Sequence, residues 1–458
     1  MNEGIFREYD IRGIVETDLT DDVVLNLGKA FGTLMKRRGY KLLTVGYDLR
    51  LSSEHLKNVY VDGLLSTGMD VINIGEVTTP TLYFSIVHLK TDGGVMITGS
   101  HNPIEFNGFK MCEGIASVFG EDIQEIKRII LESDFEAGTG SVKNTDVMPD
   151  YLAMLKGKFS FPKKLKVVID AGNATAGPVA PQLWRDLGLD VVELYCEPDG
   201  NFPNHLPDPS VPKYMKDLQA KVLEENADLG IGYDGDADRV GAVDETGRII
   251  YADTLLALFS SDVLQKKPGG QIIFDVKCSQ ALPEVIKKFG GKPLMWKTGH
   301  SLLKAKMKET GAPFAGEMSG HMFFADDYYG FDDGMYASGR LMQILANTDK
   351  KLSELVDEIP AFESTPEIRV ECADDAKFKV VADLVEAFRK EYKVIDIDGA
   401  RVEFGDGWGL VRASNTQPTL VLRFEAKTKE RLKEIIKIFM EKLALFPAVK
   451  FSDQDFQI

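Results

Sequence analysis

The chain has 458 residues, of which 44% are hydrophobic and 27% are charged. A single hydrophobic core stops growing at roughly 250 to 300 residues, so this length predicts three or four domains. No apolar run approaches the ~20 residues that cross a bilayer, and the first residues are charged without an apolar stretch. We therefore expect neither a membrane span nor a secretory signal, and a protein that works in the cytoplasm.

The net charge limits the possible partners. Lys and Arg number 54 against 71 Asp and Glu, which gives −17. A surface of this sign repels nucleic acid, so we expect no nucleic-acid partner, and an anionic substrate would need a locally basic cleft. The four cysteines lie far apart without a C-x-x-C pair, which argues against a disulfide framework and a structural zinc site.

Three consecutive segments follow one plan: a strand-like apolar run, a helix-length stretch, a second apolar run and a polar loop. Their first runs are KLLTVGYD (41–48), KLKVVIDAGN (164–173) and GQIIFDVKCS (270–279). Short runs of Val, Ile and Leu that alternate with helices indicate α/β units with mixed, largely parallel sheets. Ligands of such sheets bind at the loops that follow the strands, so we expect the three polar loops to converge on one central cleft.

The C-terminal part lacks this plan. We expect a helix near Phe378–Tyr392, a hairpin in GWGLVRASNTQPTLVLRFEA (407–426) and a helix over Lys429–Leu445. This order is typical of a smaller α+β domain. The predicted fold is therefore three similar α/β domains and a C-terminal α+β domain, with boundaries at 1–148, 149–247, 248–361 and 362–458.

The first polar loop reads TGSHNP and places Ser100 at the end of a strand, before a turn through Asn102 and Pro103. A single serine in a turn is also an ordinary structural residue, so Ser100 alone discriminates weakly. A hydrolase would require the nucleophile elbow G-x-S-x-G, which this segment does not contain. Acyl transfer is therefore disfavoured.

The second loop, DGDADR, carries Asp234, Asp236 and Asp238 at alternating positions of a tight turn. Three carboxylates placed in this way converge on a hard cation and leave coordination sites free for a phosphate oxygen, as Mg²⁺ requires. An EF-hand calcium loop is the competing interpretation, because Glu245 stands twelfth. However, Arg239 occupies the sixth position, where that loop needs Gly, and a strand pattern precedes it.

The third and fourth loops carry further polar groups. In GEMSGH, the side chains of Glu317, Ser319 and His321 project to one side if the backbone is extended, and could hydrogen-bond sugar hydroxyls. In RASNTQP, Arg412 offers a planar fork for phosphate beside hydroxyls and backbone N–H groups. Each loop taken alone also fits an ordinary polar turn.

In this order, the four loops resemble those of the α-D-phosphohexomutase superfamily over essentially the whole chain. TGSHNP resembles its phosphoserine loop, DGDADR its metal loop, GEMSGH its sugar loop and RASNTQP its phosphate loop, while YDIRG and KTGH resemble two further segments. The motif EMSGH resembles that of the phosphomannomutase/phosphoglucomutase branch. One departure is Ala237, where the family commonly has Gly, and a methyl group there is tolerated unless the residue needs a positive φ.

The resemblance implies an isomerase of carbohydrate metabolism that interconverts the 1- and 6-phosphates of glucose and mannose. Phosphorylated Ser100 would donate its phosphoryl group to a hexose monophosphate, and the resulting bisphosphate would turn around and return its other phosphate. One Mg²⁺, bound by Ser100, Asp234, Asp236 and Asp238, would neutralise the phosphoryl oxygens. Glucose 1,6-bisphosphate would act as an activator, and we expect a monomer.

The resemblance also implies roles for individual residues. The catalytic group comprises Ser100, His101, Lys110, Arg239 and His300. The substrate-binding group comprises Tyr9, Arg12, Lys277, Glu317, Ser319, His321, Arg412, Ser414, Asn415, Thr416 and Arg423, and Arg7 adds to the basic cleft. Which of Lys110, His300 and His321 moves protons stays open. So do three alternative functions: phosphoglucosamine mutase, phosphatase, and a calcium-binding interaction protein that would need the Asp loop but not Ser100.

Overall fold

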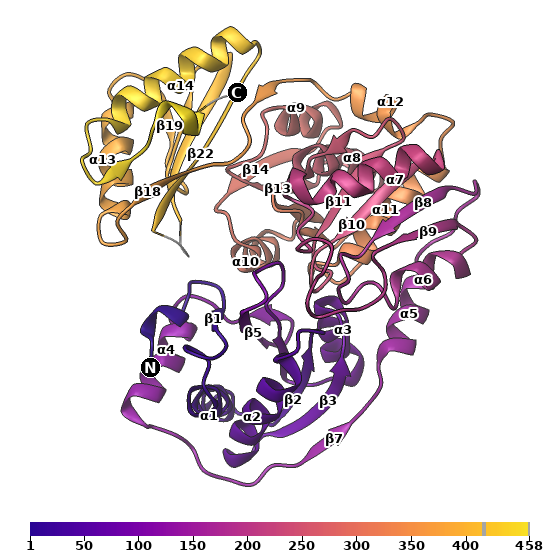
Figure 1. The fold of residues 1–458 in the computed structure, drawn as a ribbon, viewed down its shortest axis with the longest axis vertical. Coiled ribbons are helices and arrows are strands. Elements are labelled where there is room, and N and C mark those ends of the chain that lie inside the picture. The colour runs from indigo at the N-terminus through magenta and orange to yellow at the C-terminus, as the bar shows by residue number, and fades with distance from the viewer. Residues whose placement is uncertain (415–417, 457–458) are drawn as a thin grey trace. The chain divides into compact units, whose positions relative to one another are not determined.

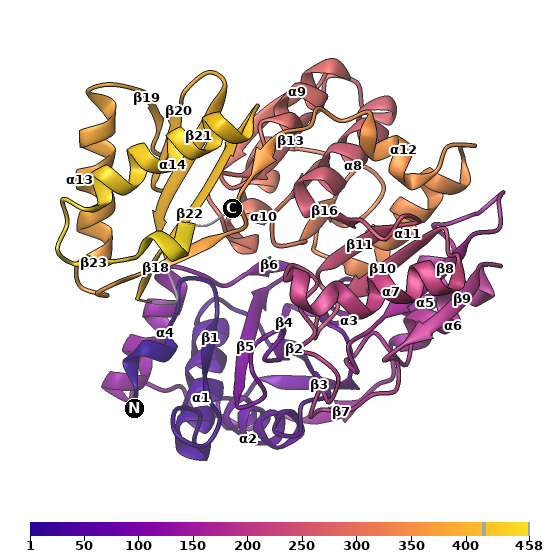
Figure 2. The ribbon, with the colours of Figure 1, turned by 45° about the horizontal axis from the view of Figure 1, so that its top comes forward.

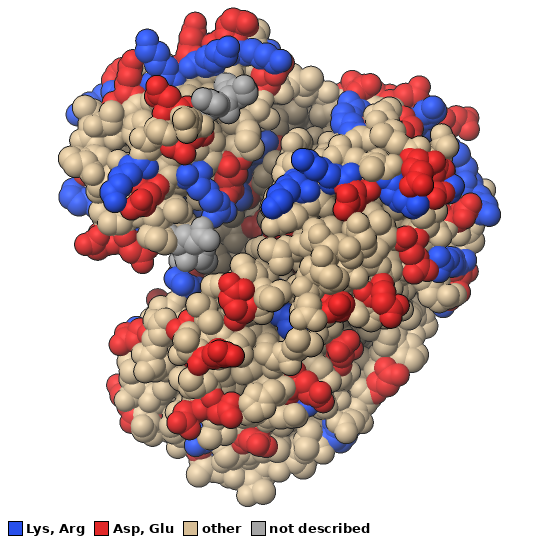
Figure 3. Space-filling view, in the orientation of Figure 1, with Lys and Arg blue, Asp and Glu red and all other residues tan. Residues whose placement is uncertain are grey.

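The computed structural model of the protein describes residues 1–414 and 418–456. The chain divides into two compact units, the first formed by residues 1–255 and 319–356 and the second by residues 256–318 and 357–458. Within the described ranges, no helix is long and apolar enough to span a bilayer. On the face drawn in Figure 3, the N-terminal part of the chain carries many Asp and Glu and few Lys or Arg, in keeping with the net charge of −17.

The first unit opens with a mixed sheet in the order β1-β5-β4-β2-β3-β7. β2 is parallel to β3 and β4, whereas β5 is antiparallel to β1 and β4. Its strands are β1 (Ile11–Ile14), β2 (Leu42–Tyr47), β3 (Asp70–Glu76), β4 (Gly93–Ile97), β5 (Phe106–Glu113), β6 (Ala116–Ser117) and β7 (Val142–Asn144). A short 3-10 helix (Glu3–Ile5) precedes them, and the helices are α1 (Asp21–Arg37), α2 (Ser53–Ser66), α3 (Thr79–Leu89) and α4 (Glu121–Glu132).

Helices cover both faces of this sheet. Val95 and Ile97 of β4 face the core beneath α1, α2 and α4, whereas Met96 between them faces the smaller core beneath α3. Figure 1 shows β2 and β3 between α2 and α3. Successive strand residues point to opposite faces, so a strand buried on both sides reads as the continuous apolar run seen in the sequence. β4 ends at Ile97, and the serine loop (residues 98–105) connects it to β5.

The second sheet of the first unit has the order β12-β11-β10-β8-β9. Its strands are β8 (Lys166–Asp170), β9 (Asp190–Leu194), β10 (Leu229–Tyr233), β11 (Val240–Asp244) and β12 (Ile249–Ile250). Around it lie α5 (Met148–Lys156), α6 (Ala180–Asp186), a 3-10 turn (Pro212–Met215), α7 (Lys216–Glu225) and α11 (Gly334–Ala346), and the unit also holds β16 (Met322–Phe324). β10 and β11 are antiparallel and Tyr233 pairs with Val240. The carboxylate loop (residues 234–239) is thus the connection of a hairpin.

In the second unit, β13 (Gln271–Asp275) lies between β14 (Lys292–Trp296) and β15 (Phe314–Gly316), all parallel. The helices of this part are α8 (Ala252–Lys266), whose first turn belongs to the first unit, α9 (Ala281–Lys288) and α10 (His300–Thr310). α12 (Leu352–Asp357) lies in the segment that leads to the C-terminal part.

The C-terminal sheet is antiparallel, in the order β19-β20-β21-β22-β18-β23, with β17 also on β22. Its strands are β17 (Glu363–Ser364), β18 (Ile368–Cys372), β19 (Lys393–Ile395), β20 (Ala400–Glu403), β21 (Gly407–Ala413), β22 (Thr419–Ala426) and β23 (Val449–Lys450). α13 (Lys377–Arg389) and α14 (Lys429–Leu443) share one core with one face of the sheet (Figure 2), and a 3-10 turn (Asp453–Phe456) follows. The predicted fold class of three α/β parts and a C-terminal α+β part is confirmed.

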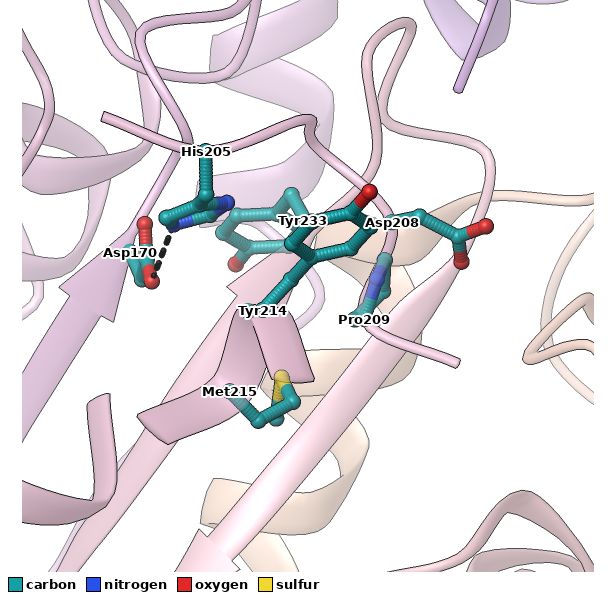
Figure 4. A pocket seen from close by; sticks show the side chains of 8 residues that line it. Asp170, His205, Asp208, Pro209, Tyr214, Met215 and Tyr233 are labelled. Atoms are coloured by element: carbon teal, nitrogen blue, oxygen red, sulfur yellow. Dashed lines mark hydrogen bonds and ion pairs between the residues drawn. The ribbon is translucent and has the colours of Figure 1, made fainter. Parts of the chain in front are cut away.

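A small pocket lies beside β10 in the first unit (Figure 4), between the end of β8 and the loop over residues 204–209. His205 Nε2 is 3.1 Å from Asp170 Oδ2, and His205 Nδ1 is 2.9 Å from the Leu206 carbonyl oxygen. Both ring nitrogens therefore face acceptors, which suits the doubly protonated imidazolium. Burial alone would lower the pKa of His205, but the hydrogen bond and charge of Asp170 outweigh it and raise the pKa above its ordinary value.

This pair predicts a pH-dependent contribution to stability. The pKa of His205 in the folded protein lies above that of an unfolded His, which is about 6.5. The pair therefore stabilises the fold fully at pH values below the unfolded pKa, and this stabilisation is lost as the pH rises through the folded pKa. We expect the difference in thermal midpoint between the wild type and His205→Gln to be larger near about pH 5.5 than near about pH 8.5. His55→Gln, which alters an exposed pair, is the control. A difference that grows with pH would contradict this assignment.

Candidate functional site

Ser100 is held directly against the carboxylate loop. Its side chain is buried, and its hydroxyl donates to Asp234 Oδ2 at 2.8 Å. The Ser100 hydroxyl oxygen also lies 3.2 Å from His101 Nδ1, and the Ser100 N–H donates to Thr98 Oγ1. The structure therefore brings the first two predicted loops together within one unit.

The three carboxylates of the carboxylate loop converge. Asp234, Asp236 and Asp238 are fully buried, and one oxygen from each lies within 4.8 Å of the others. Burial and the two neighbouring carboxylates raise the pKa of Asp234 well above its ordinary value. Burial acts in the same direction on Asp236 and Asp238, but Lys110, together with Thr79 at Asp236 and with His321 and Arg239 at Asp238, lowers the pKa of both. Three buried like charges are costly unless cations compensate them.

Lys110 of β5 supplies one of these cations. Its ammonium lies 2.6 Å from Asp236 Oδ2 and 2.5 Å from Asp238 Oδ2. Burial would lower the pKa of Lys110, but the charges of the three aspartates raise it above the ordinary value. In this arrangement Lys110 is a fixed positive charge of the cluster.

The cluster fits a divalent metal ion. Asp236 Oδ1 is buried and accepts no hydrogen bond from any part of the chain that the structure describes. A buried carboxylate oxygen without a donor is costly, and a cation satisfies it. The three carboxylates and the Ser100 hydroxyl form an all-oxygen set, which suits a hard ion with further positions for water or phosphate.

Thr79, at the start of α3, orients one of these carboxylates, and the sequence analysis missed it. Its hydroxyl donates to Asp236 Oδ2 at 2.6 Å and its N–H donates to the Asp236 carbonyl oxygen at 2.9 Å. Groups that hydrogen-bond a metal ligand fix its orientation. The sequence around Thr79 is typical of an ordinary helix start, because Thr78 caps the helix and Pro80 follows.

We expect Thr79→Val, which keeps the shape but removes the hydroxyl, to weaken divalent-cation binding by about tenfold or more, whereas Thr79→Ser retains it. Calorimetric titration of the purified protein with Mg²⁺ measures this directly. Equal binding by the Val and Ser variants would remove Thr79 from the site.

Ala237 has φ +60°, in the left-handed region. The departure from the family's usual Gly therefore falls at a position that does need a positive φ. The conformation is fixed on both sides: the Ala237 N–H donates to the Asp234 carbonyl oxygen, and the Ala237 carbonyl oxygen accepts from Gly334 N. A side chain with a Cβ carries a strain here that glycine does not.

We expect Ala237→Gly to stabilise the folded protein by up to about 1 kcal/mol. The backbone strain energy that Gly relieves exceeds the free-energy cost of the conformational entropy that Gly adds to the unfolded chain. Ala337→Gly inside α11 is the matched control and should destabilise by a similar amount. Denaturant midpoints of the three proteins test the sign. A lower midpoint for Ala237→Gly would refute the strain argument.

Part of the third predicted loop joins the carboxylate loop. His321 forms a β-bridge with Arg239. His321 Nε2 lies 3.2 Å from Asp238 Oδ1 and 3.3 Å from Arg239 Nε, while His321 Nδ1 lies 3.0 Å from Ser319 Oγ. The Arg239 N–H donates to Asp234 Oδ1 at 3.1 Å. His321 and Arg239 thus contact the same carboxylates, and Ser319 hydrogen-bonds to His321.

Arg12 of β1 approaches the serine loop from the N-terminal segment. One of its amino groups donates to Asn102 Oδ1 at 3.0 Å, and another pairs with Asp10 at 2.6 Å. The pKa of His101 lies well below its ordinary value. Burial is the largest cause, and the positive charges of Arg239 and Arg12 act in the same direction. Tyr9 and Arg7 are half-buried just before β1.

The remaining predicted residues form a second group within the second unit. Glu317 accepts a hydrogen bond from Gly299 N at 2.5 Å, which joins it to the KTGH segment that contains His300. Arg412 Nε and Thr298 N both donate to Asp398 Oδ2 at 3.0 Å. Asp398, which the sequence analysis missed, therefore ties the KTGH segment to the strand that carries Arg412.

Arg423 and Lys277 belong to this second group. Arg423 donates to the Lys277 carbonyl oxygen and contacts Met318 Sδ at 3.0 Å. The Lys277 ammonium is 3.2 Å from Glu367 and, against the effect of burial, lowers the pKa of Glu367 to about 2. Ser414 is buried at the end of β21, whereas Asn415 and Thr416 lie outside the described residues.

Known proteins resemble the whole chain. Family profiles described as phosphoglucomutase/phosphomannomutase alpha/beta/alpha domains I, II and III match residues 3–137, 149–247 and 251–362, and the C-terminal domain profile matches residues 367–442. A phosphomannomutase/phosphoglucomutase of Pseudomonas aeruginosa PAO1 is 48% identical over 96% of this chain and 95% of its own length. A phosphoglucomutase of Neisseria gonorrhoeae is 46% identical over 94% and 95%.

A solved structure agrees with these sequence relatives. The crystal structure of a phosphoglucomutase/phosphomannomutase family protein from Burkholderia thailandensis superposes with a TM-score of 0.92 at 42% identity, and covers 98% of this chain and 99% of that one. The similarity therefore extends over all four sheets.

Proposed function

The chain belongs to the phosphoglucomutase/phosphomannomutase family, and we propose that it reversibly interconverts the 1- and 6-phosphates of glucose and mannose. One observation carries the mechanism: the Ser100 hydroxyl is buried and lies 2.8 Å from Asp234, inside a cluster of three converging carboxylates. That is where a phosphoryl group on Ser100 would meet a metal ion.

Ser100 carries the phosphoryl group between substrates. In the first half-reaction the bond between phosphorus and Ser100 Oγ breaks and a bond from phosphorus to the free sugar hydroxyl oxygen forms, while the proton of that hydroxyl ends on Ser100 Oγ. The hexose 1,6-bisphosphate then reverses in the site and returns its other phosphate to Ser100. Mg²⁺, held by Ser100, Asp234, Asp236 and Asp238, would neutralise charge on the transferring oxygens. Lys110 and Arg239 hold fixed positive charge around the same carboxylates.

Residues predicted from the third and fourth loops would bind the substrate. We assign the sugar's O3 and O4 hydroxyls to Glu317 and Ser319, because glucose and mannose share these and differ only at C2. Arg412 would hold the phosphate that is not being transferred, with Ser414, Asn415 and Thr416. Tyr9, Arg12, Lys277, His300, His321 and Arg423 would complete the binding surface. Glucose 1,6-bisphosphate would rephosphorylate Ser100 whenever the intermediate escapes.

We also propose the division of the chain into domains that the sequence predicts. The domain boundaries at 1–148, 149–247, 248–361 and 362–458 assign one loop of the proposed site to each domain. A monomer in the cytoplasm stays a prediction from the sequence.

The mutase assay tests the proposal. With Mg²⁺ and catalytic glucose 1,6-bisphosphate, the purified protein should convert glucose 1-phosphate and mannose 1-phosphate, and galactose 1-phosphate, altered at C4, poorly. Ser100→Ala should lower kcat by about a thousandfold or more, because no other nucleophile takes its place. Ser210→Ala, which alters an exposed serine, is the control. Turnover by Ser100→Ala within about tenfold of the wild type would refute the mechanism.

A further inference from the structure

Arg50, between β2 and α2, binds the backbone of the serine loop and its junction with β5. Its side chain is 2% exposed. One amino group donates to the carbonyl oxygens of Pro103 and Phe106 at 2.7 and 3.0 Å, and the other donates to those of Ser100 and Asn102 at 2.7 and 2.5 Å. One guanidinium therefore satisfies four backbone acceptors of the segment that carries Ser100.

Asp48 holds this guanidinium in place. Asp48 Oδ1 accepts from the Arg50 N–H at 3.0 Å, and Asp48 Oδ2 lies 3.5 Å from Arg50 Nε. The same carboxylate accepts from Thr98 Oγ1 and from Gly99 N. The ring of Phe202 lies 5.2 Å from the guanidinium carbon, in cation–π range. Asp48 and Arg50 thus fix both the N–H side and the carbonyl side of the serine loop.

The loop is shaped to admit this side chain. A Cβ atom at Gly99 would lie 2.4 Å from Arg50 Nε, so any larger residue would displace the guanidinium. Burial lowers the pKa of Arg50, and the charge of Asp48 opposes that effect. An arginine stays charged even so. Burying a charge is costly, and here the acceptors that offset the cost belong to one functional loop.

Ser100 itself is in a conformation that needs such support. Its φ is +47°, in the left-handed region, which a residue with a Cβ keeps only when its surroundings enforce it. Arg50 binds the Ser100 carbonyl oxygen from one side. On the carboxylate loop, Gly235 approaches the same oxygen so closely that a Cβ there would lie 2.3 Å from it. These contacts set the direction of the Ser100 hydroxyl toward Asp234.

We propose that Arg50 is a positioning residue for Ser100: its guanidinium binds backbone carbonyl groups of the serine loop and Asp48, and it holds the serine in the geometry from which the phosphoryl group is transferred. This inference rests on the proposed function of Ser100. Lysine cannot substitute, because an ammonium lacks the planar fork that reaches four carbonyl groups at once.

The test separates positioning from stability. For Arg50→Ala and Arg50→Lys we expect kcat to fall by about a hundredfold while KM for glucose 1-phosphate changes by less than about threefold. The rate at which glucose 1,6-bisphosphate phosphorylates Ser100 in a single turnover should fall in parallel. Added guanidinium ion at non-denaturing concentration should restore kcat of Arg50→Ala by about tenfold, and should leave Ser100→Ala inactive.

Arg340→Ala is the matched control, since Arg340 is equally buried, and its partners Asp326 and the Phe324 ring lie outside the serine loop and the carboxylate loop. It should lose thermal stability and keep kcat. If Arg50→Ala fails to fold, Arg50→Lys with an unchanged thermal midpoint carries the test. A kcat within about threefold of the wild type in the folded Lys variant, or an equal loss in Arg340→Ala, would overturn the inference. An inactive wild type whose Ser100 is never phosphorylated would instead overturn the proposed function.

Discussion

The buried cluster of Asp234, Asp236 and Asp238 is the constraint around which the first unit is arranged. Three carboxylates without solvent repel one another, and the fold compensates them from several elements. Lys110 reaches them from β5, Thr79 from the start of α3, and Ser100 from the end of β4. Thr175 holds the backbone of the same loop by donating to the Gly235 carbonyl oxygen at 2.6 Å. A divalent cation bound at the cluster would complete this balance.

Backbone strain is also present at this place. Ser100 and Ala237 both have positive φ, one on each of the two loops that meet. Both loops are anchored at strand ends, the serine loop between β4 and β5 and the carboxylate loop between β10 and β11. Rigid strands on both sides allow an unfavourable backbone conformation to persist, and such conformations cluster at functional sites. Arg50 extends this support to the loop carbonyls.

The sequence predicted the elements well where the apolar pattern determines them. The hairpin of β21 and β22 lies within the predicted 407–426, and α14 ends at Leu443, close to the predicted Leu445. The contact of Ser100 with the carboxylate loop was also anticipated, because the family resemblance places both in one site. Thr79, Arg50 and Asp398 were not found, because each acts on residues distant in sequence and has no local pattern that distinguishes it from a helix start or a loop residue. The strain at Ala237 depended on a φ value that only coordinates supply.

The central claim is that Ser100, held at the carboxylate cluster, carries the phosphoryl group. Incubation with isotopically labelled glucose 1,6-bisphosphate and Mg²⁺, followed by peptide mapping, measures where the label resides. The account predicts one labelled phosphate per chain, confined to Ser100, formed only when the divalent cation is present and passed on to added mannose 6-phosphate. Label on another residue, or an unlabelled protein that still turns substrate over, would contradict it.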